Sequence, residues 1–380
     1  MARIAVNALG NLKGGTWRNL LVLLDQWHET GELDRHRFTL YASQGVLEGI
    51  PAKWTNHIGV RACLNPGASL SRRFFVEQYS LPRWMACDGI EICFCPTNIV
   101  PLRCTIPSVL VFQQAAPFDK AISLSMVGFK AWTVFLVLRR LMMAGACRAR
   151  RVVFLSRHFR DVFRQHCPIP LEKTHVIPRC ADSHRTMSPQ AVPFSTEIPE
   201  EFVLCISRLH PYKCILEVIQ GYVLFRRRAP SRARLLLAGD SPFPGYRRRI
   251  DKAIAASGFA EDIRLMGFCN ADQMAFLQER AFCQVFASLC ENCPTTVIEA
   301  LAQGMPLVCS HMSSMPEVAG DAAVYCDPRS PEDIASGISR IYGNPAFQEQ
   351  LRKKAITRFT ELPDARTTAK DTLSVILDSR

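Results

Sequence analysis

The chain has 380 residues, of which 48% are hydrophobic and 21% are charged. This length allows about two ordinary domains, and the composition is that of a folded globular protein, which excludes the disordered and fibrous classes. A net charge of +12 indicates a surface that attracts anions, but no nucleic-acid-binding motif accompanies it, so we expect no nucleic-acid partner.

The first half of the chain alternates between short strands and helices. A strand at residues 3–7 is followed by a glycine-bearing turn at 10–15 and by a helix with apolar residues from Leu20 to Trp27. Strand, glycine turn and helix are the opening of a βαβ fold with a parallel sheet. Further strands are predicted, in chain order, at residues 38–41, 90–94, 108–112, 152–155 and 176–177.

One segment of this half bears on membranes. Residues 131–138 are mostly apolar, but the run stops at Arg139 and Arg140, well short of the ~20 residues that span a bilayer. The wider stretch 129–151 fits a buried helix flanked by arginines, and it also fits an element that rests on anionic lipid. The sequence leaves both interpretations open, so an anionic membrane surface stays among the candidate partners.

The second half repeats the α/β pattern after a change in composition. Residues 181–200 contain several prolines, serines and threonines without periodicity, which is typical of a linker. Strands are then predicted at 202–206, 235–238, 263–266, 283–287 and 307–309, with helices over 213–228 and from about Pro294.

We therefore predict two Rossmann-like α/β domains with parallel sheets that face an interdomain cleft. The N-terminal domain covers residues 1–180, the linker 181–200 and the C-terminal domain 201–362. Residues 363–380 form a helix that packs back toward the N-terminal domain. Ligands of open parallel sheets bind at the carboxyl ends of the strands, so the site is expected there.

Sixteen cysteines do not by themselves indicate disulfides. The first ten residues lack the features of a secretory signal peptide. Many cysteines, such as Cys205 and Cys309, stand in apolar runs, where a free thiol packs as a small hydrophobic side chain. Cys290 and Cys293 have no second pair at zinc-finger spacing. We expect a reducing, cytoplasmic location, with the inner membrane face as a peripheral alternative, and no metal site.

Two stretches of the second half carry candidate chemistry. Ser207 to Lys213 follows a strand, and its Arg208 and Lys213 suit an anion, because arginine forks two phosphate oxygens and lysine adds a mobile charge. Glu291 to Glu299 runs from a turn into a helix, whose first N–H groups can receive a phosphate. Taken separately, these residues would fit ordinary surface cations and helix-end acids.

Together they resemble glycosyltransferase family 4, whose members have the two-domain GT-B fold. The similarity covers most of residues 202–340 in the order and spacing of the family. It consists of the Arg-Leu-x-x-x-Lys loop from Arg208, the strand end Leu-Leu-Leu-Ala-Gly-Asp, Ile-Arg-Leu-Met-Gly-Phe, the pair Glu291 and Glu299, Glu-Ala-Leu-Ala-Gln-Gly-Met-Pro-Leu-Val and Ser-Ser-Met-Pro-Glu-Val-Ala-Gly. The N-terminal half is similar mainly at Gly14–Gly15.

The resemblance implies a retaining transferase that takes a sugar from a nucleotide-diphosphate donor and needs neither a metal nor another cofactor. Arg208 and Lys213 would hold the diphosphate and stabilise the departing nucleotide, Glu291 would contact the transferred sugar, and Glu299 would bind the ribose. The other donor-binding residues that the resemblance implies are Gly14, Gly15, Ser207, Gly267, Phe268, Thr295 and Thr296.

The acceptor side departs from the family. Many relatives have a histidine near the transferred sugar, whereas this chain has a stretch led by Gln113 and Gln114. An amide can hydrogen-bond to donor or acceptor hydroxyls but cannot act as a base at neutral pH. The predicted acceptor is a glycan or a lipid-linked sugar. A GT-B epimerase or hydrolase, and a non-catalytic protein that binds nucleotide sugars, are the alternatives.

Overall fold

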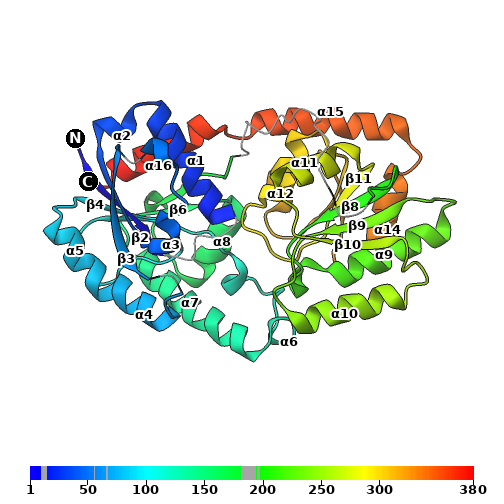
Figure 1. Ribbon diagram of the computed structural model, residues 1–380, viewed down its shortest axis with the longest axis horizontal. Coiled ribbons are helices and arrows are strands. Elements are labelled where there is room, and N and C mark those ends of the chain that lie inside the picture. The colour runs from blue at the N-terminus through cyan, green and yellow to red at the C-terminus, as the bar shows by residue number, and fades with distance from the viewer. Residues whose placement is uncertain (10–14, 55, 66, 181–193, 195–196) are drawn as a thin grey trace. The chain divides into compact units, whose positions relative to one another are not determined.

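The computed structural model describes residues 1–9, 15–54, 56–65, 67–180, 194 and 197–380 (Figure 1). The chain divides into two compact units. Unit 1 comprises residues 1–118, 131–180 and 363–380, and unit 2 comprises residues 119–130 and 181–362. Most of the predicted linker, 181–200, lies outside the described residues.

Unit 1 is built on a parallel sheet of seven strands in the order β3-β2-β1-β4-β5-β6-β7. The strands are β1 (Arg3–Ala8), β2 (Arg37–Ser43), β3 (Ile58–Leu64), β4 (Ile92–Cys95), β5 (Ser108–Val111), β6 (Arg151–Phe154) and β7 (Thr174–Val176). The helices are α1 (Gly15–Glu29), α2 (Glu32–Arg35), α3 (Gln44–Leu47), α4 (Leu70–Phe75), α5 (Leu81–Cys87), α7 (Phe129–Arg148), α8 (Arg157–His166) and α16 (Ala365–Leu377), with a π-helical turn η2 (Val76–Ser80) between α4 and α5.

The C-terminal helix α16 completes unit 1 because it packs against α1 at the other end of the sequence. Trp27 of α1 is almost fully buried, and its indole Nε1 donates a hydrogen bond of 2.9 Å to the carbonyl of Ala369 in α16. The same indole stacks on Phe38 of β2 with ring centroids 5.2 Å apart. A buried indole needs both an apolar wall and an acceptor for its N–H, and β2 and α16 supply them.

Unit 2 is built on a parallel sheet of six strands in the order β10-β9-β8-β11-β12-β13. The strands are β8 (Phe202–Ile206), β9 (Arg234–Ala238), β10 (Ile263–Gly267), β11 (Cys283–Phe286), β12 (Leu307–Ser310) and β13 (Ala323–Cys326). The helices are α6 (Leu124–Val127), α9 (Ile215–Arg228), α10 (Pro244–Ala255), α11 (Ala271–Arg280), α12 (Thr295–Ala302), α13 (Met315–Ala319), α14 (Pro331–Ile341) and α15 (Pro345–Glu361).

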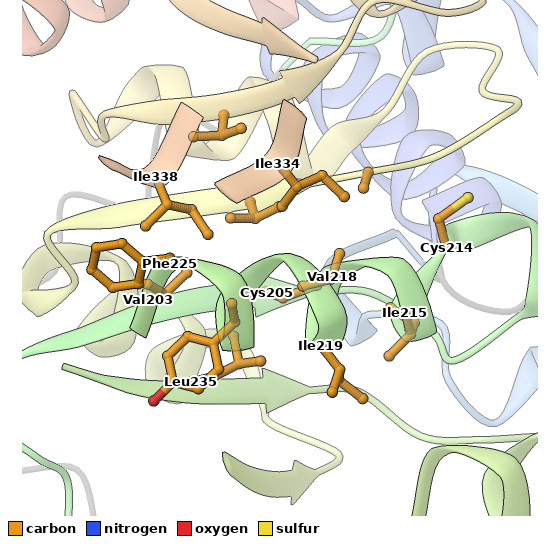
Figure 2. Packing of buried hydrophobic residues seen from close by; sticks show 14 of the residues in the cluster. Val203, Cys205, Cys214, Ile215, Val218, Ile219, Phe225, Leu235, Ile334 and Ile338 are labelled. Carbon is orange, nitrogen blue, oxygen red and sulfur yellow. The ribbon is translucent and has the colours of Figure 1, made fainter. Parts of the chain in front are cut away.

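The core of unit 2 lies where α9 and α14 cover one face of this sheet. Figure 2 shows Ile334 and Ile338 of α14 directed toward α9, whose Val218 is fully buried. The two helices approach closely at Gly221, where an added Cβ would lie 2.7 Å from the Cγ2 of Ile334. Since that position admits no larger residue without a shift, the glycine sets the spacing of the two helices.

Two strands and one segment differ from the sequence-based expectation. Neither β3 nor β13 is predicted from the sequence. The strand β3 contains Gly59 and Arg61 and is buried only at its two ends, so it lacks a continuous apolar run, whereas β13 is an apolar run of only four residues. Residues 119–130, which the sequence places in the N-terminal domain, pack with unit 2, where α6 contacts the short 3-10 turn η6 (Pro211–Lys213).

The described part of the chain contains no helix that combines the length and the apolar character needed to cross a membrane.

Candidate functional site

The sheet of unit 2 has its topological switch point between β8 and β11. The chain moves outward from β8 through β9 to β10, and then returns to the other side of β8 with β11. Because all these strands are parallel, the segments after them meet at one edge, and a ligand of such a sheet binds beside the switch point. The loops that follow β8 and β11 contain Arg208, Lys213 and Glu291.

The segment after β8 places Lys213 at a bend. The sequence predicts a helix from Lys213, but the structure forms η6 over Pro211–Lys213 and starts α9 only at Ile215. Cys214 lies between them in the left-handed conformation, with φ of 51°. Proline favours a first helical turn, so a short turn starts at Pro211. The left-handed Cys214 then interrupts the helical conformation, and α9 begins after it.

Lys213 and Glu291 form an ion pair across the switch point. The Lys213 Nζ donates to the Glu291 Oε1, and the two side chains are only 14% and 16% exposed. Burial on its own lowers the pKa of Lys213, but the facing Glu291 carboxylate and Tyr212 outweigh it and raise that pKa. Lys213 therefore carries a full positive charge at neutral pH, 5.2 Å from the ring centroid of Phe286.

Arg208 is more exposed and lies on the other side of the same segment. Its Nε contacts the Oδ1 of Asp240, which follows β9, at 3.3 Å. The backbone joins the two loops as well, since the N–H of Leu209 donates to the carbonyl of Asp240 at 2.9 Å. An exposed pair of this kind contributes little to stability, so Arg208 is available to an anionic ligand at small cost.

The backbone of Glu291 is held by two serines that the sequence analysis does not assign to the site. The hydroxyls of Ser313 and Ser314 donate to the Glu291 carbonyl at 2.7 and 2.9 Å, and the Glu291 N–H donates to the Ser313 Oγ at 3.2 Å. Ser313 adopts a left-handed φ of 55°. These residues belong to the Ser-Ser-Met-Pro-Glu motif, so a signal for them is present in the sequence.

The helix α12 begins four residues after Glu291. It is preceded by Pro294, and no side chain caps it. The N–H groups of Val297 and Ile298 bond to the carbonyl of Pro294, which leaves those of Thr295 and Thr296 without an acceptor inside the helix. A helix start of this kind suits a phosphate.

The other predicted donor residues of unit 2 line the same sheet edge. Ser207 directly follows β8, with its Oγ bonded to the Arg208 carbonyl at 3.1 Å. Gly267 ends β10 with φ of 70°, and Phe268 after it is largely exposed. Glu299 lies in the second turn of α12 and is half-buried.

The predicted residues of the N-terminal half lie in unit 1. Gly14 is outside the described residues, and Gly15 is the first residue of α1. Gln113 is buried, and its side-chain oxygen accepts from the Nη2 of Arg179, whereas Gln114 is exposed. The two amides, which the sequence treats alike, therefore differ in the structure: Gln113 is buried and bonded, whereas Gln114 is exposed.

The lowered pKa of His210 should make the free energy of unfolding depend on pH. Burial, followed by the charges of Arg208 and Lys213, lowers its pKa from 6.5 to about 4, against an opposing effect of Asp240. Because the fold favours the neutral ring, His210 contributes stability above pH 6.5, and this contribution is lost as the pH falls toward 4.

We expect His210→Phe to remove that part of the acid sensitivity while keeping the aromatic contact with Phe243. The urea-derived free energy of unfolding should fall between pH 7.5 and 4.5 by roughly 2–3 kcal/mol more in the wild type than in the variant. Equal losses in the two proteins would contradict the lowered pKa.

Among the residues that the structure describes, no three His, Cys, Asp or Glu side chains gather into a group that could hold a metal ion. In unit 2, Arg208, Lys213 and the start of α12 are groups of the kind that can bind a phosphate.

The C-terminal half of the chain, which contains this site, is similar to known sequences. Residues 191–358 match the family model of glycosyl transferases group 1. The O-antigen chain mannosyltransferase B of Escherichia coli is 28% identical over 149 residues, which are 39% of this chain and 38% of that protein. The glycogen synthase of Mycobacterium tuberculosis is 27% identical over 180 residues, 47% of this chain and 42% of its own length. The matched part thus covers less than half of either relative.

Comparison with solved structures extends the likeness to the whole chain. HepE of Anabaena in complex with UDP superposes with a TM-score of 0.75 at 17% identity and 100% coverage of both chains. The sucrose-phosphate synthase of Thermosynechococcus elongatus gives 0.78 at 16% identity, covering 100% of this chain and 99% of the other. The protein has the GT-B fold of glycosyltransferases, with two parallel-sheet α/β domains. Its C-terminal half carries the sequence similarity to glycosyl transferases group 1.

Proposed function

We propose that the protein is a retaining glycosyltransferase of the family 4 type, which transfers a sugar from a nucleotide-diphosphate donor to a carbohydrate or lipid-linked acceptor. The observation that carries the proposal is the buried Lys213–Glu291 pair at the switch point of unit 2, beside Arg208. The match of residues 191–358 to glycosyl transferases group 1 supports it.

The Lys213–Glu291 ion pair suggests how a nucleotide-sugar donor would bind. A diphosphate carries more negative charge than one carboxylate, so it would displace Glu291 from Lys213 and draw in Arg208 from the opposite side. Glu291 would then be released to accept hydrogen bonds from the hydroxyls of the transferred sugar. The N–H groups at the start of α12 would bind the remaining phosphate oxygens, with Glu299 on the ribose.

The chemistry then needs charge stabilisation more than a protein base. The bond between the sugar C1 and the β-phosphate oxygen breaks, and a bond from C1 to the acceptor oxygen forms on the same face. The departing phosphate oxygen takes the proton of the acceptor hydroxyl. Fixed cations stabilise the charge that develops on the leaving group, so no metal is invoked. A covalent glycosyl intermediate on a protein carboxylate would contradict this route.

Donor binding is tested by thermal shift with UDP-, GDP-, ADP- and dTDP-sugars, since a ligand that binds only the native state stabilises it. A concentration of one hundred times Kd gives about 2.7 kcal/mol. We expect one nucleotide to raise the Tm, and the same donor to support transfer to an acceptor. Turnover of that donor without any acceptor would favour a hydrolase or epimerase instead.

The substitution Glu299→Gln should weaken binding of the nucleotide-sugar donor that the thermal-shift measurement identifies. A carboxylate that accepts two ribose hydroxyls contributes as a charged hydrogen-bond partner, so we expect Kd to rise roughly ten- to a hundredfold. Glu279→Gln, which changes an exposed residue of α11, is the matched control and should leave Kd unchanged. Wild-type affinity in Glu299→Gln would remove this residue from the site.

A further inference from the structure

Unit 1 contains a cavity that the donor site does not use. Its volume is about 640 Å³. It lies between α4, the π-helical turn η2 and α7, and it reaches the residues that follow β4 and β5. The lining residues that matter here are Leu70, Phe74, Glu77, Thr97, Val134 and Val137.

This cavity combines exposed apolar side chains with buried polar ones. Most of the large lining side chains that are exposed to solvent are apolar, among them Leu70, Phe74 and Val137, the last with 56% exposure. The deeply buried lining side chains include Glu77 and Thr97, which are polar. Exposed apolar clusters and buried polar groups are each the informative exception to normal burial, and here they line a single cavity.

The buried end of the cavity also contains a hydroxyl that has no hydrogen-bond partner among the described residues. Thr97 is only 7% exposed, and its Oγ1 has no hydrogen-bond partner among the described residues. Its neighbour Asn98 has a left-handed φ of 68°, and the Asn98 Oδ1 accepts from the N–H groups of Gln113 and Gln114 at 2.6 and 3.1 Å. A strained backbone beside an unpaired buried hydroxyl is costly unless something else uses it.

The backbone conformation and a hydrogen bond hold Glu77 in its buried position. The chain between α4 and α5 winds as a π-helix over Val76–Ser80, a form that is rare and often found at functional sites. Glu77 accepts a hydrogen bond of 2.7 Å from the side chain of Asn7 at the end of β1. Gln78 is anchored in turn, since its Nε2 donates to the carbonyl of Val100 at 3.1 Å.

We infer that this cavity binds the acceptor as an amphiphile: a hydrocarbon chain lies against Leu70, Phe74 and Val137, and a hydroxylated head group reaches Thr97. The inference rests on the proposed function in calling the ligand an acceptor. It selects a lipid-linked sugar over a free glycan, because a free glycan has nothing to place against the apolar rim.

The size and position of the cavity favour this occupant over a protein partner. A volume of 640 Å³ lies within the range of roughly 300–1,000 Å³ that small-molecule sites span. Thr97 and Gln114 follow β4 and β5 at the carboxyl edge of a parallel sheet, which is the edge where such folds bind ligands. The polar end of the ligand thus lies at the ligand-binding edge of this sheet.

The first test is calorimetric titration of the whole chain, without nucleotide, with hexyl, octyl and decyl β-glucoside below the concentrations at which each forms micelles. A chain that enters an apolar groove should bind roughly tenfold more tightly for every two added methylenes. An affinity independent of chain length would overturn the inference.

Two variants of the same helix then separate the cavity from general adsorption. Val137 lines the cavity, whereas Leu136 beside it does not, although it is 43% exposed. We expect Val137→Asn to raise the Kd for decyl glucoside at least about tenfold and Leu136→Asn to change it less than twofold. Equal weakening in both would mean adsorption on an apolar surface and would overturn the inference. Val134→Asn, also at the exposed rim, repeats the test at a second position.

The head-group contact is tested by Thr97→Val, which keeps the shape and removes the hydroxyl. Loss of an unpaired buried hydroxyl should leave the Tm unchanged or higher, while the Kd for decyl glucoside rises several-fold. The Kd for decyltrimethylammonium, whose head group can neither donate nor accept a conventional hydrogen bond, should not change. An unchanged glucoside Kd would remove the head group from the buried end of the cavity.

These binding measurements need no donor and no turnover, so their failure is distinct from that of the proposed function. If both the proposed function and this inference hold, the KM for glucoside acceptors should fall with chain length in the wild type and less steeply in Val137→Asn.

Discussion

Replacing Lys213 by methionine should lower the kcat of sugar transfer by about 10²–10³-fold, the loss expected when one preorganised group that stabilises the leaving group is removed. The Nζ of Lys213 is held in place before any substrate binds, by its ion pair with Glu291 and by the nearby Phe286 ring. The charge is therefore in position when the nucleotide departs, and methionine fills the same space without it.

The same change should also destabilise the protein, and the two effects can be separated. Removing Lys213 leaves the Glu291 carboxylate unpaired in a site that is only 16% exposed, at a cost of about 3 kcal/mol. The double variant Lys213→Met with Glu291→Gln removes both charges and should regain most of the lost Tm without regaining activity. Lys353→Met is the control, because that lysine is 75% exposed and its ion pair with Glu349 lies on the surface.

The measurements are single-turnover transfer rates and thermal melts of the four proteins. If the double variant recovered both its Tm and its rate of transfer, Lys213 would have a structural role alone and the proposed leaving-group role would be wrong.

Gly239→Ala should disrupt donor binding through the backbone. Gly239 directly follows β9 and has φ of 144°, and an added Cβ would lie 2.0 Å from the carbonyl oxygen of Ser207. No side-chain rotation relieves a clash with a backbone oxygen, so the segment that carries Arg208 must move away. We expect a loss of stability of about 1–3 kcal/mol and a rise of at least about tenfold in the Kd of the donor, measured by titration.

A second glycine provides the matched control for this prediction. Gly258 also has a positive φ, 77°, but an added Cβ there would meet no atom within 4 Å. Gly258→Ala therefore carries the cost of the left-handed conformation, about 1–2 kcal/mol, without displacing the site. Equal donor affinity in the two variants would show that the close approach of Gly239 to Ser207 does not position the donor loop.

The strands of the second half show how much secondary structure the local sequence pattern predicts. The runs at 202–206, 235–238 and 263–266 appear as β8, β9 and β10 within one or two residues. The central strands β8 and β9 are largely buried, and a central parallel strand appears in the sequence as a short apolar run. The edge strand β10 is buried only at Ile263. The edge strand β3 is not predicted because it contains Gly59 and Arg61 and is buried only at its first and last residues.

The site residues divide in the same way. Arg208, Lys213, Glu291 and Glu299 stand in motifs, so the sequence alone names them as candidate site residues. Their partners do not: Asp240 contacts Arg208 from a loop 32 positions away, and Ser313 and Ser314 hold the Glu291 carbonyl from 22 and 23 positions away. Such contacts follow from the order of strands in the sheet, which no local pattern encodes.

By itself the sequence determined the alternation of strands and helices, the two-domain α/β class and the motif residues of the second half, because these depend on periodicity and on residues close together in the chain. Only the tertiary structure decided that Lys213 pairs with Glu291, that residues 119–130 join unit 2, and that Thr97 and Val137 line one cavity. The physical reason is that parallel strands bring together loops far apart in sequence, and burial and pairing arise only once they meet.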